Sequence, residues 1–172
     1  MQVFFFSPSL TIALYFVLWA ILPLGSAFLC LRLPDRFFRP DAFLWRTHRW
    51  EREGRIYDRL FFIHTWKRLL PDGGAAFQKR GYRKRTLTDF SEENLERFLV
   101  ESARGELTHY LAIFPFWVFG LFSPPKVVWI MLGYALLVNL PCILAQRYNR
   151  PRVQAVLARV RAKKTFSRIS SK

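Results

Sequence analysis

Two long stretches of this chain carry no charged side chain, and they limit what it can fold into. The first covers residues 1–31 and the second covers residues 127–145. A helix needs about 20 mostly apolar residues to cross the hydrocarbon core of a bilayer, so each stretch is long enough. A third, at 107–122, crosses only if the helix takes in residues before it. The sequence predicts an all-α integral membrane protein with about three transmembrane helices. Their expected bounds are about 3–31, 105–122 and 126–146.

The distribution of charge predicts the topology of a single membrane domain, 1–172. Of the 27 Lys and Arg residues, 17 lie in 32–105 and nine in 147–172. Because basic segments that flank membrane spans stay on the cytoplasmic side, both 32–104 and the basic tail 147–172 are expected there. The N-terminus is then outside, and the last two spans reverse at the outer face near Pro124 and Pro125.

The same distribution points to the partner of the basic residues. Nucleic acid binding would need a soluble basic face, whereas these residues flank membrane spans, so anionic membrane lipid is the expected partner and nucleic acid is not. Residues 1–31 lack a basic start and a small-residue cleavage site, which favours an uncleaved anchor over a signal peptide.

The cytoplasmic segment contains a helical stripe of apolar residues interleaved with Arg and Lys. The stripe consists of Ile56, Leu60, Ile63, Trp66 and Leu70. This pattern predicts an amphipathic helix that lies in the membrane interface and ends at 71–74. A basic loop follows at 79–85. Two interpretations of this loop stay open: it holds the phosphates of an acyl donor, or it binds anionic lipid.

A polar cluster at 101–109 stands directly before the second apolar segment. A helix is expected to begin at Ser91, a good N-cap, and to continue through this cluster into the membrane. Glu106 and His109 are three residues apart, a spacing at which helix side chains meet, and a carboxylate beside an imidazole suits a general base. Glu101 and Arg104 have the same spacing and are expected to neutralise each other.

The last helix carries a second polar stripe. Asn139, Gln146 and Arg150 are expected on nearly one face, with a kink at Pro141 between them. Arg can hold a carboxylate or phosphate with two hydrogen bonds, and amides can bind sugar hydroxyls. The two stripes would then form two halves of one site.

Two other interpretations of the cluster at 101–109 stay open. A Glu-x-x-His pair is also half of a di-iron motif, but the second half is missing and no metal is expected. The cluster also fits a purely structural network that holds helix ends together.

Three blocks of the sequence resemble a known family. Residues 66–74 read WKRLLPDGG, residues 101–109 read ESARGELTH and residues 139–152 read NLPCILAQRYNRPR. They resemble the corresponding blocks of the glycosyl-4,4'-diaponeurosporenoate acyltransferase family, over roughly 30–155. The resemblance implies a membrane acyltransferase of bacterial carotenoid biosynthesis. Such an enzyme moves a fatty acyl group to the primary hydroxyl of a glucose esterified to a C30 carotenoid acid, or to another lipid-linked sugar.

The residues and the resemblance lead to one expected mechanism. His109, with Glu106, would be the catalytic base that takes the proton of the acceptor hydroxyl. Arg104, Arg147 or Asn149 would stabilise the oxyanion. The expected substrate-binding residues are Trp66, Lys67, Glu101, Arg104, Asn139, Gln146, Arg147, Tyr148, Asn149 and Arg150.

The expected reaction needs no cofactor beyond an acyl donor such as acyl-CoA as co-substrate. The expected location is the bacterial cell membrane, crossed several times, with the C-terminus in the cytoplasm. Two other functions stay open: a non-enzymatic membrane subunit or lipid-binding scaffold, and a transferase acting on polyprenyl phosphates.

Overall fold

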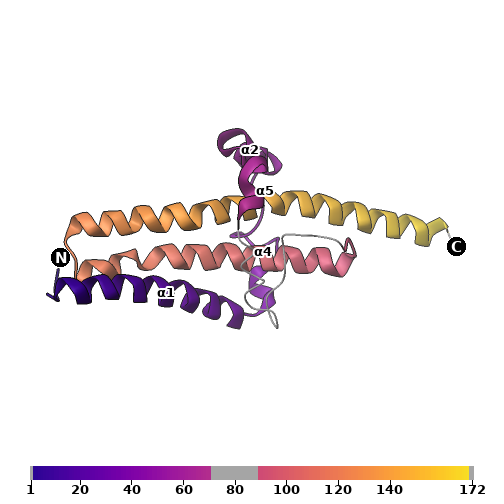
Figure 1. Cartoon of the computed structure of the whole chain (residues 1–172). Coiled ribbons are helices and arrows are strands. Elements are labelled where there is room, and N and C mark those ends of the chain that lie inside the picture. Colours follow the sequence, from indigo (N-terminus) through magenta and orange to yellow (C-terminus); the bar gives the residue numbers. More distant parts are fainter. Residues whose placement is uncertain (1, 71–88, 171–172) are drawn as a thin grey trace. The chain divides into compact units, whose positions relative to one another are not determined.

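The computed structural model describes residues 2–70 and 89–170, and every element assigned in them is a helix (Figure 1). The predicted all-α class is confirmed for this part of the chain. The long helices are α1 (Pro8–Arg32), α4 (Glu92–Ile113) and α5 (Pro125–Ser170). The short elements are η1 (Asp35–Phe38), η2 (Arg49–Gly54), α2 (Arg55–Phe61), α3 (Ile63–Trp66), η3 (Lys67–Leu69) and η5 (Phe114–Leu121).

The chain divides into two compact units. The first unit consists of Met1–Leu33 and Gly105–Ile143, and the second consists of Pro34–Arg104 and Leu144–Lys172. Helices α4 and α5 each contribute one part to each unit.

Two helices of the described residues, α1 and α5, are long and apolar enough to cross a membrane. Helix α1 begins where the sequence favours it, because the Ser7 hydroxyl accepts a hydrogen bond from the Leu10 amide (3.4 Å) and Pro8 needs no N–H partner. The third expected span, 105–122, is not one α-helix. Helix α4 ends at Ile113 and the chain continues as the 3₁₀ helix η5, beginning next to Pro115, which has no N–H to donate.

Helix α4 follows the sequence prediction closely. The amide of Asn94 donates to the Ser91 hydroxyl (3.3 Å), so Ser91 is the N-cap, and Glu92 and Glu93 occupy the first turn. Acidic side chains there are stabilised by the helix dipole. The helix then continues without interruption through 101–109, as expected. The reversal expected near Pro124 is also confirmed, because η5 ends at Leu121 and α5 begins at Pro125.

The predicted single amphipathic helix after Ile56 is wrong. Phe62 has left-handed backbone dihedrals (φ 49°, ψ 42°), which end α2 and turn the chain before α3. The turn buries Tyr57 and Ile63 together against Tyr148, instead of placing one apolar stripe along one face. Helix α5, in contrast, is longer than expected: it runs through Pro141 and the predicted span end at residue 146 into the basic tail.

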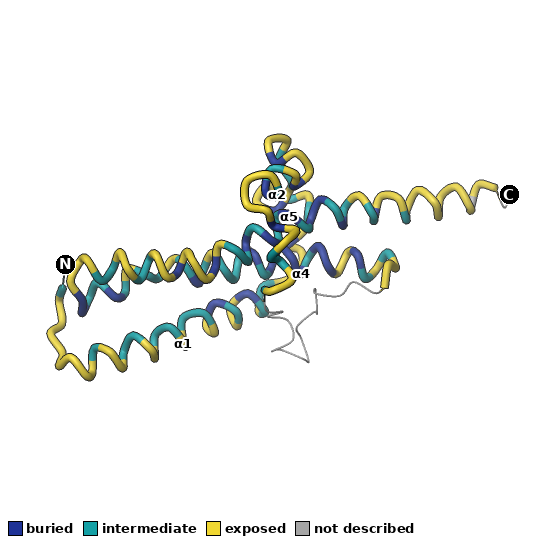
Figure 2. The backbone as a smooth tube through the Cα atoms, turned by 45° about the horizontal axis from the view of Figure 1, so that its top comes forward, coloured by how far each residue is buried: buried dark blue, intermediate teal, exposed yellow. Residues whose placement is uncertain are grey.

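Aromatic packing holds the first unit together. Helix α1, the last part of α4 with η5, and the first part of α5 lie side by side (Figure 1). Trp19 of α1 packs on Phe119 and on Tyr134, with ring centroids 5.3 and 4.7 Å apart. The Tyr15 hydroxyl hydrogen-bonds that of Ser123 (2.8 Å). The outside of this unit stays apolar, and α1 is exposed along most of its length (Figure 2).

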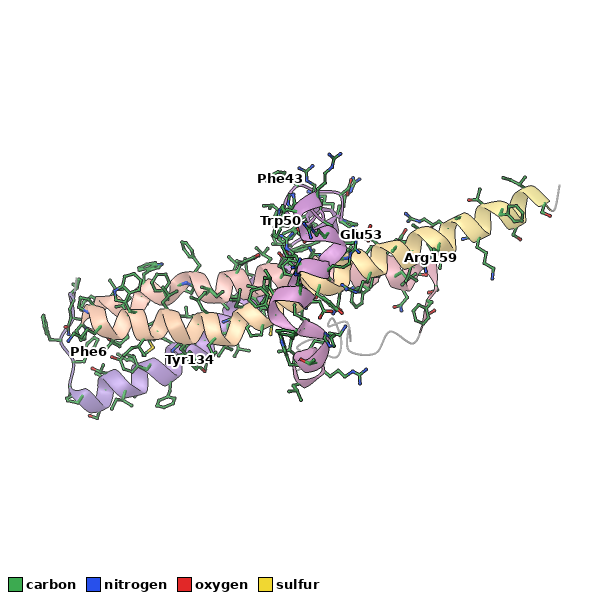
Figure 3. All side chains as sticks on the ribbon, turned by 90° about the horizontal axis from the view of Figure 1, so that it is seen from above. Phe6, Phe43, Trp50, Glu53, Tyr134 and Arg159 are labelled. Atoms are coloured by element: carbon green, nitrogen blue, oxygen red, sulfur yellow. The ribbon has the colours of Figure 1, made fainter. Side chains whose placement is uncertain are left out.

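Two small apolar cores lie among the described residues of the second unit. The first joins the start of α4 to the last part of α5 and consists of Leu95, Phe98, Leu99, Val153 and Leu157. The second is the Tyr57, Ile63 and Tyr148 cluster. Exposed aromatic residues such as Phe43 and Trp50 lie on the segments between α1 and α2 (Figure 3).

Candidate functional site

Polar side chains at 101–109 of α4 contact those of α5 in each unit. In the first unit, His109 Nδ1 lies 2.9 Å from Asn139 Oδ1. In the second unit, the Ser102 hydroxyl donates to Gln146 Oε1 (2.8 Å). Side chains of the polar cluster at 101–109 and of the polar stripe of the last helix are therefore in contact at both points, and the prediction that they form two halves of one site stays a prediction.

The His109–Asn139 contact determines which ring nitrogen carries the proton. Asn139 is buried, and its Nδ2 donates to the backbone carbonyl of Ala135 one turn earlier (2.9 Å). This contact directs Oδ1 of Asn139 at the imidazole. Because an amide oxygen only accepts, Nδ1 of His109 must be the donor, and the neutral ring then has its lone pair on Nε2. A ring held in this tautomer can accept a proton at Nε2.

Glu106 lies one turn before His109 on α4 and is fully buried. The expected pairing of Glu106 with His109 stays a prediction, since the described partner of Nδ1 is Asn139. Sequence spacing within α4 suggested the carboxylate, whereas the amide comes from α5, 30 residues away. Asn139 was expected among the substrate-binding residues, so the signal that singled it out was its place in the polar stripe.

The predicted neutralising pair of Glu101 and Arg104 is present and forms part of a larger network. Both side chains are buried, and Arg104 Nη1 donates to Glu101 Oε1. Arg104 also pairs with Asp35, and Arg97 pairs with Glu101 (3.1 Å). The guanidinium of Arg104 lies over the ring of Phe38, 4.9 Å from its centroid. The buried charges of Glu101 and Arg104 thus each have partners of opposite charge, as buried charges must, and the outer partners Arg97 and Asp35 are about half exposed.

Arg147 and Arg150 fasten the segment before α2 to helix α5. Arg147 contacts Glu51 Oε1 (3.2 Å) and the backbone carbonyl of Leu44 (2.9 Å). Arg150, fully buried, donates to the carbonyl of Trp45 (3.0 Å). Both arginines were expected to bind substrate, and their described contacts are with the chain itself.

Glu51 was missed by the sequence analysis. Its side chain is 1% exposed and accepts hydrogen bonds from Arg147 and from the His48 amide (3.1 Å). It becomes buried because the next residues, Arg52 (φ 48°) and Glu53 (φ 57°), adopt left-handed dihedrals. Neither is a residue type that favours this conformation, so no local pattern announced the turn.

A third group of polar residues surrounds the ring of Tyr148. Lys67 Nζ donates to Asn149 Oδ1 (3.0 Å) and lies 4.6 Å from the ring centroid. Arg152 Cζ lies 3.5 Å from the same centroid. Burial lowers the pKa of Lys67, and the positive charges of Arg152 and Arg68 lower this pKa further. Trp66, also expected near substrate, donates from its indole to the Phe61 carbonyl (2.6 Å).

Two sequence predictions fall on residues outside the described ranges. The helix end expected at 71–74 and the basic loop at 79–85 both lie between residues 70 and 89. Within the described ranges, no three His, Cys, Asp or Glu side chains come close enough together to hold a metal ion.

Comparison with known proteins identifies the family. The family model of glycosyl-4,4'-diaponeurosporenoate acyltransferase matches residues 34–159. A glycosyl-4,4'-diaponeurosporenoate acyltransferase of Staphylococcus aureus (strain bovine RF122 / ET3-1) is 32% identical over 139 residues, and that of strain USA300 is 33% identical. Each alignment covers 81% of this chain and 83% of the relative. No solved structure matches the chain. The chain therefore belongs to the glycosyl-4,4'-diaponeurosporenoate acyltransferase family, and it is an acyltransferase.

Proposed function

We propose that this acyltransferase moves a fatty acyl group from an activated donor to a sugar hydroxyl of a glycosylated carotenoid or a similar lipid-linked sugar. The names of the relatives support this acceptor class, because they act on a glycosylated diaponeurosporenoate. An apolar acceptor of this kind suits an enzyme with apolar helices. A non-enzymatic scaffold is set aside, since the family is one of acyltransferases.

The observation that carries the mechanism is the contact between His109 and Asn139. Asn139 holds Nδ1–H, so Nε2 accepts the proton of the sugar hydroxyl as its oxygen attacks the acyl carbonyl. A new C–O bond forms, the bond from the acyl carbon to the leaving group breaks, and the leaving group takes the proton from Nε2. With an acyl thioester as donor, the products are the sugar ester and a free thiol. Asn139 is a positioning residue in this scheme.

The residues expected to stabilise the oxyanion now differ in how well they fit that role. Arg104 and Arg147 are held by carboxylates, which favours structural roles for both. Asn149 accepts from Lys67 through its oxygen, and this leaves the amide hydrogens of Asn149 to donate. An oxyanion role for Asn149 stays a prediction.

We also propose that the protein crosses a bacterial membrane three times, with the N-terminus outside. Helices α1 and α5 supply two spans, and the residues from Gly105 through η5 supply the third. The apolar surface of the first unit supports this arrangement, because such a surface is stable only against hydrocarbon or another protein.

A reconstituted assay tests the proposed reaction. The purified protein in lipid nanodiscs is given an acyl-CoA and either a glucosyl carotenoid ester or a glucosyl lipid without the carotenoid. Ester formation is followed by mass spectrometry. We expect product with the carotenoid glycoside, and a loss of rate of about 10²–10⁴-fold in His109→Ala, the usual contribution of a general base.

His64→Gln is the matched control, because His64 is exposed and pairs with Asp58 in the second unit (2.7 Å). It should leave the rate unchanged. An unchanged rate in a folded His109→Ala protein would contradict the assignment of the base. Failure of the wild type to acylate any glycosylated acceptor would contradict the proposed function itself.

A further inference from the structure

The ring of Tyr148 has two positive groups against it, and among the described residues neither group forms an ion pair with a carboxylate. Asp58 is the carboxylate that acts on both groups, and it does so electrostatically. Lys67 Nζ and Arg152 Cζ lie 4.6 and 3.5 Å from the ring centroid. Each contact is favourable, because a cation is attracted to the face of an aromatic ring. The two cations nevertheless repel each other, and this repulsion favours a negative charge nearby.

The hydrogen bonds around Tyr148 leave donors in excess. Lys67 gives one of its three N–H groups to Asn149, and Arg152 Nη1 donates to the Tyr148 carbonyl (2.6 Å). Because the oxygen of Asn149 is occupied by Lys67, its amide group presents hydrogens. Lys67, Asn149 and Arg152 together therefore offer several N–H groups and no side-chain acceptor beyond the one already used.

Charges on the neighbouring elements do not cancel this excess. Asp58 of α2 is the one carboxylate, among the described residues, that raises the pKa of Lys67, and its effect ranks last of those acting on Lys67. Asp58 is already engaged, because it accepts from the ring and the amide of His64 (2.7 and 3.1 Å). Arg68 adds a further positive charge.

The backbone at Gly54 keeps Arg152 in place. Gly54 has φ +83°, and a Cβ there would lie 2.9 Å from Arg152 Nη1 and 3.0 Å from the Tyr148 carbonyl oxygen. The chain thus approaches this part of α5 as closely as a residue without a side chain permits. Arg152 thus packs against both the Gly54 backbone and the Tyr148 ring.

We propose that Lys67, Asn149 and Arg152 bind a phosphate ester. A phosphate accepts several hydrogen bonds and carries the charge that the two cations lack. The role of this site in the reaction rests on the proposed acyl transfer. The ester is the phosphate of a coenzyme A-type acyl donor or that of an anionic lipid. Both sources present the same phosphate chemistry to the site, and binding measurements with each ligand distinguish them.

Direct binding of coenzyme A tests the proposal without any transfer reaction. The full chain in phosphatidylcholine nanodiscs is titrated with coenzyme A by isothermal calorimetry, and with phosphatidylglycerol added to the nanodisc as a competitor. Lys67→Gln and Arg152→Gln each remove one charge, and each should weaken binding by about tenfold, as expected for a hydrogen bond to a charged group. Lys67→Arg should restore most of the affinity.

Lys163→Gln is the control, because it removes the same charge from an exposed position on the tail of α5. It should bind like the wild type. Enrichment of phosphatidylglycerol around the wild type, measured by mass spectrometry of lipids that copurify with it, and its loss in Lys67→Gln and Arg152→Gln, with no binding of coenzyme A, would support the site and assign it to lipid. The proposal is overturned if the wild type binds neither phosphate ester, or if folded Lys67→Gln and Arg152→Gln bind as the wild type does.

The outcome is independent of the proposed function. If the wild type transfers acyl groups but its affinity for coenzyme A does not change when Lys67 or Arg152 is replaced, only the phosphate site is contradicted. A wild type that binds phosphate esters through these residues but acylates no sugar defeats only the proposed acyl transfer.

Discussion

Helices α4 and α5 run through both units of this protein, but they have an apolar outside in the first unit and bury charged side chains in the second. In the first unit, α4 and α5 present apolar side chains outward, and residues such as Leu137 (74% exposed) and Trp129 (68%) face the surroundings. In the second unit, the same helices bury charges, with Glu101, Arg104 and Arg150 all nearly inaccessible. A unit with an apolar outside suits hydrocarbon, and a unit with paired charges inside suits an aqueous interface.

This contrast explains why the polar groups of the two units have different roles. The first unit has few buried polar side chains, and His109 is held there by a neutral amide. Buried charges of the second unit, such as Glu101, Arg104 and Glu51, have partners of opposite charge, so they fix the fold, whereas Lys67 and Arg152 place two positive charges against one ring. Ionisable groups within a membrane segment are costly, which supports the catalytic role proposed for His109.

The largest expected effect comes from breaking a buried charge pair in the second unit. Glu51→Ala leaves Arg147 without its carboxylate. Breaking such a pair usually costs about 3–5 kcal/mol of unfolding free energy. Glu53→Ala is the control, because it removes the same side chain two residues away, at an exposed position. Unfolding in detergent, followed by circular dichroism, measures both; equal stability of the two variants would refute the structural role of Glu51.

A charge on the outside of the first unit should have the next largest effect. Leu137→Arg places a guanidinium on the apolar part of α5, at a cost of about 2.5–3.5 kcal/mol for insertion at the centre of a span. Ile169→Arg introduces the same charge on the same helix, in the second unit, at a side chain that is also exposed (70%). After carbonate washing of membranes, we expect loss of Leu137→Arg only. Retention of both variants would mean that α5 does not meet hydrocarbon at Leu137.

Two glycines provide a smaller test of the same comparison. Gly54→Ala forces a side chain into a left-handed backbone and against Arg152, with an expected cost of about 1–3 kcal/mol. Gly133→Ala lies in α5 of the first unit, where a Cβ would meet nothing within 4 Å. It should be neutral or slightly stabilising, because alanine favours a helix. The melting temperatures of both variants are compared with that of the wild type. A Gly133→Ala protein that melts below the wild type would contradict the open space described around Gly133.

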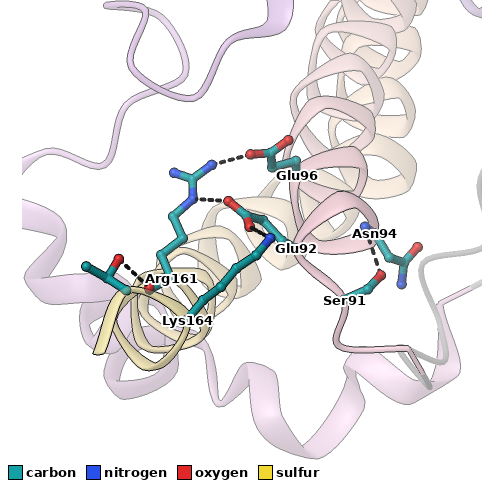
Figure 4. Close-up of polar contacts among 7 residues, drawn as sticks. Ser91, Glu92, Asn94, Glu96, Arg161 and Lys164 are labelled. Carbon is teal, nitrogen blue, oxygen red and sulfur yellow. Dashed lines mark hydrogen bonds and ion pairs between the residues drawn. The ribbon is translucent and has the colours of Figure 1, made fainter. Parts of the chain in front are cut away.

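The smallest effect concerns the exposed ion pairs at the far end of the second unit. Arg161 pairs with Glu92 and Glu96, and Lys164 pairs with Glu92 (3.2 Å) (Figure 4). Hydrogen bonds from Arg161, and then from Lys164, lower the pKa of Glu92 below its ordinary 4.5. A carboxyl whose pKa is lowered by folding stabilises the folded state at pH values above its pKa in the unfolded chain. This stabilisation is lost as the pH falls through the pKa of the folded state.

Hydrogen exchange of the last turns of α5 is compared at neutral pH and near pH 3, and protection factors are calculated with the intrinsic exchange rate at each pH; we expect lower protection factors in acid. Arg161→Gln should weaken this pH dependence, whereas Arg159→Gln, an exposed control on the same helix (Figure 3), should keep it. An identical pH response in all three proteins would remove Glu92 as its cause.

Sequence reasoning succeeded where the information was local. The N-cap at Ser91 and the pair of Glu101 with Arg104 each depend on residues three positions apart, and helical geometry then brings them together. It failed where distant segments decide the structure. Asp35 reaches Arg104 across 69 residues. The left-handed turn at Phe62 exists because it buries Tyr57 and Ile63 against Tyr148, and Phe itself does not favour that backbone.

The candidate site shows the same division. Helical periodicity grouped Glu106 with His109, and Asn139 with Gln146, and the structure brings His109 to Asn139. Periodicity alone could not say that an amide from α5 would hold Nδ1. That assignment needs the contact of Asn139 with Ala135, which depends on how α5 packs.

The central claim is that Asn139 acts through His109 as the catalytic base, and a double-mutant cycle tests it most directly. Acyl transfer is measured under single-turnover conditions for the wild type, Asn139→Leu, His109→Gln and the double variant. We predict that Asn139→Leu alone slows transfer about tenfold and that it has no further effect once His109 is replaced, because residues acting as one unit are not additive. Additive losses, or a His109→Gln protein with wild-type rate, would contradict the account.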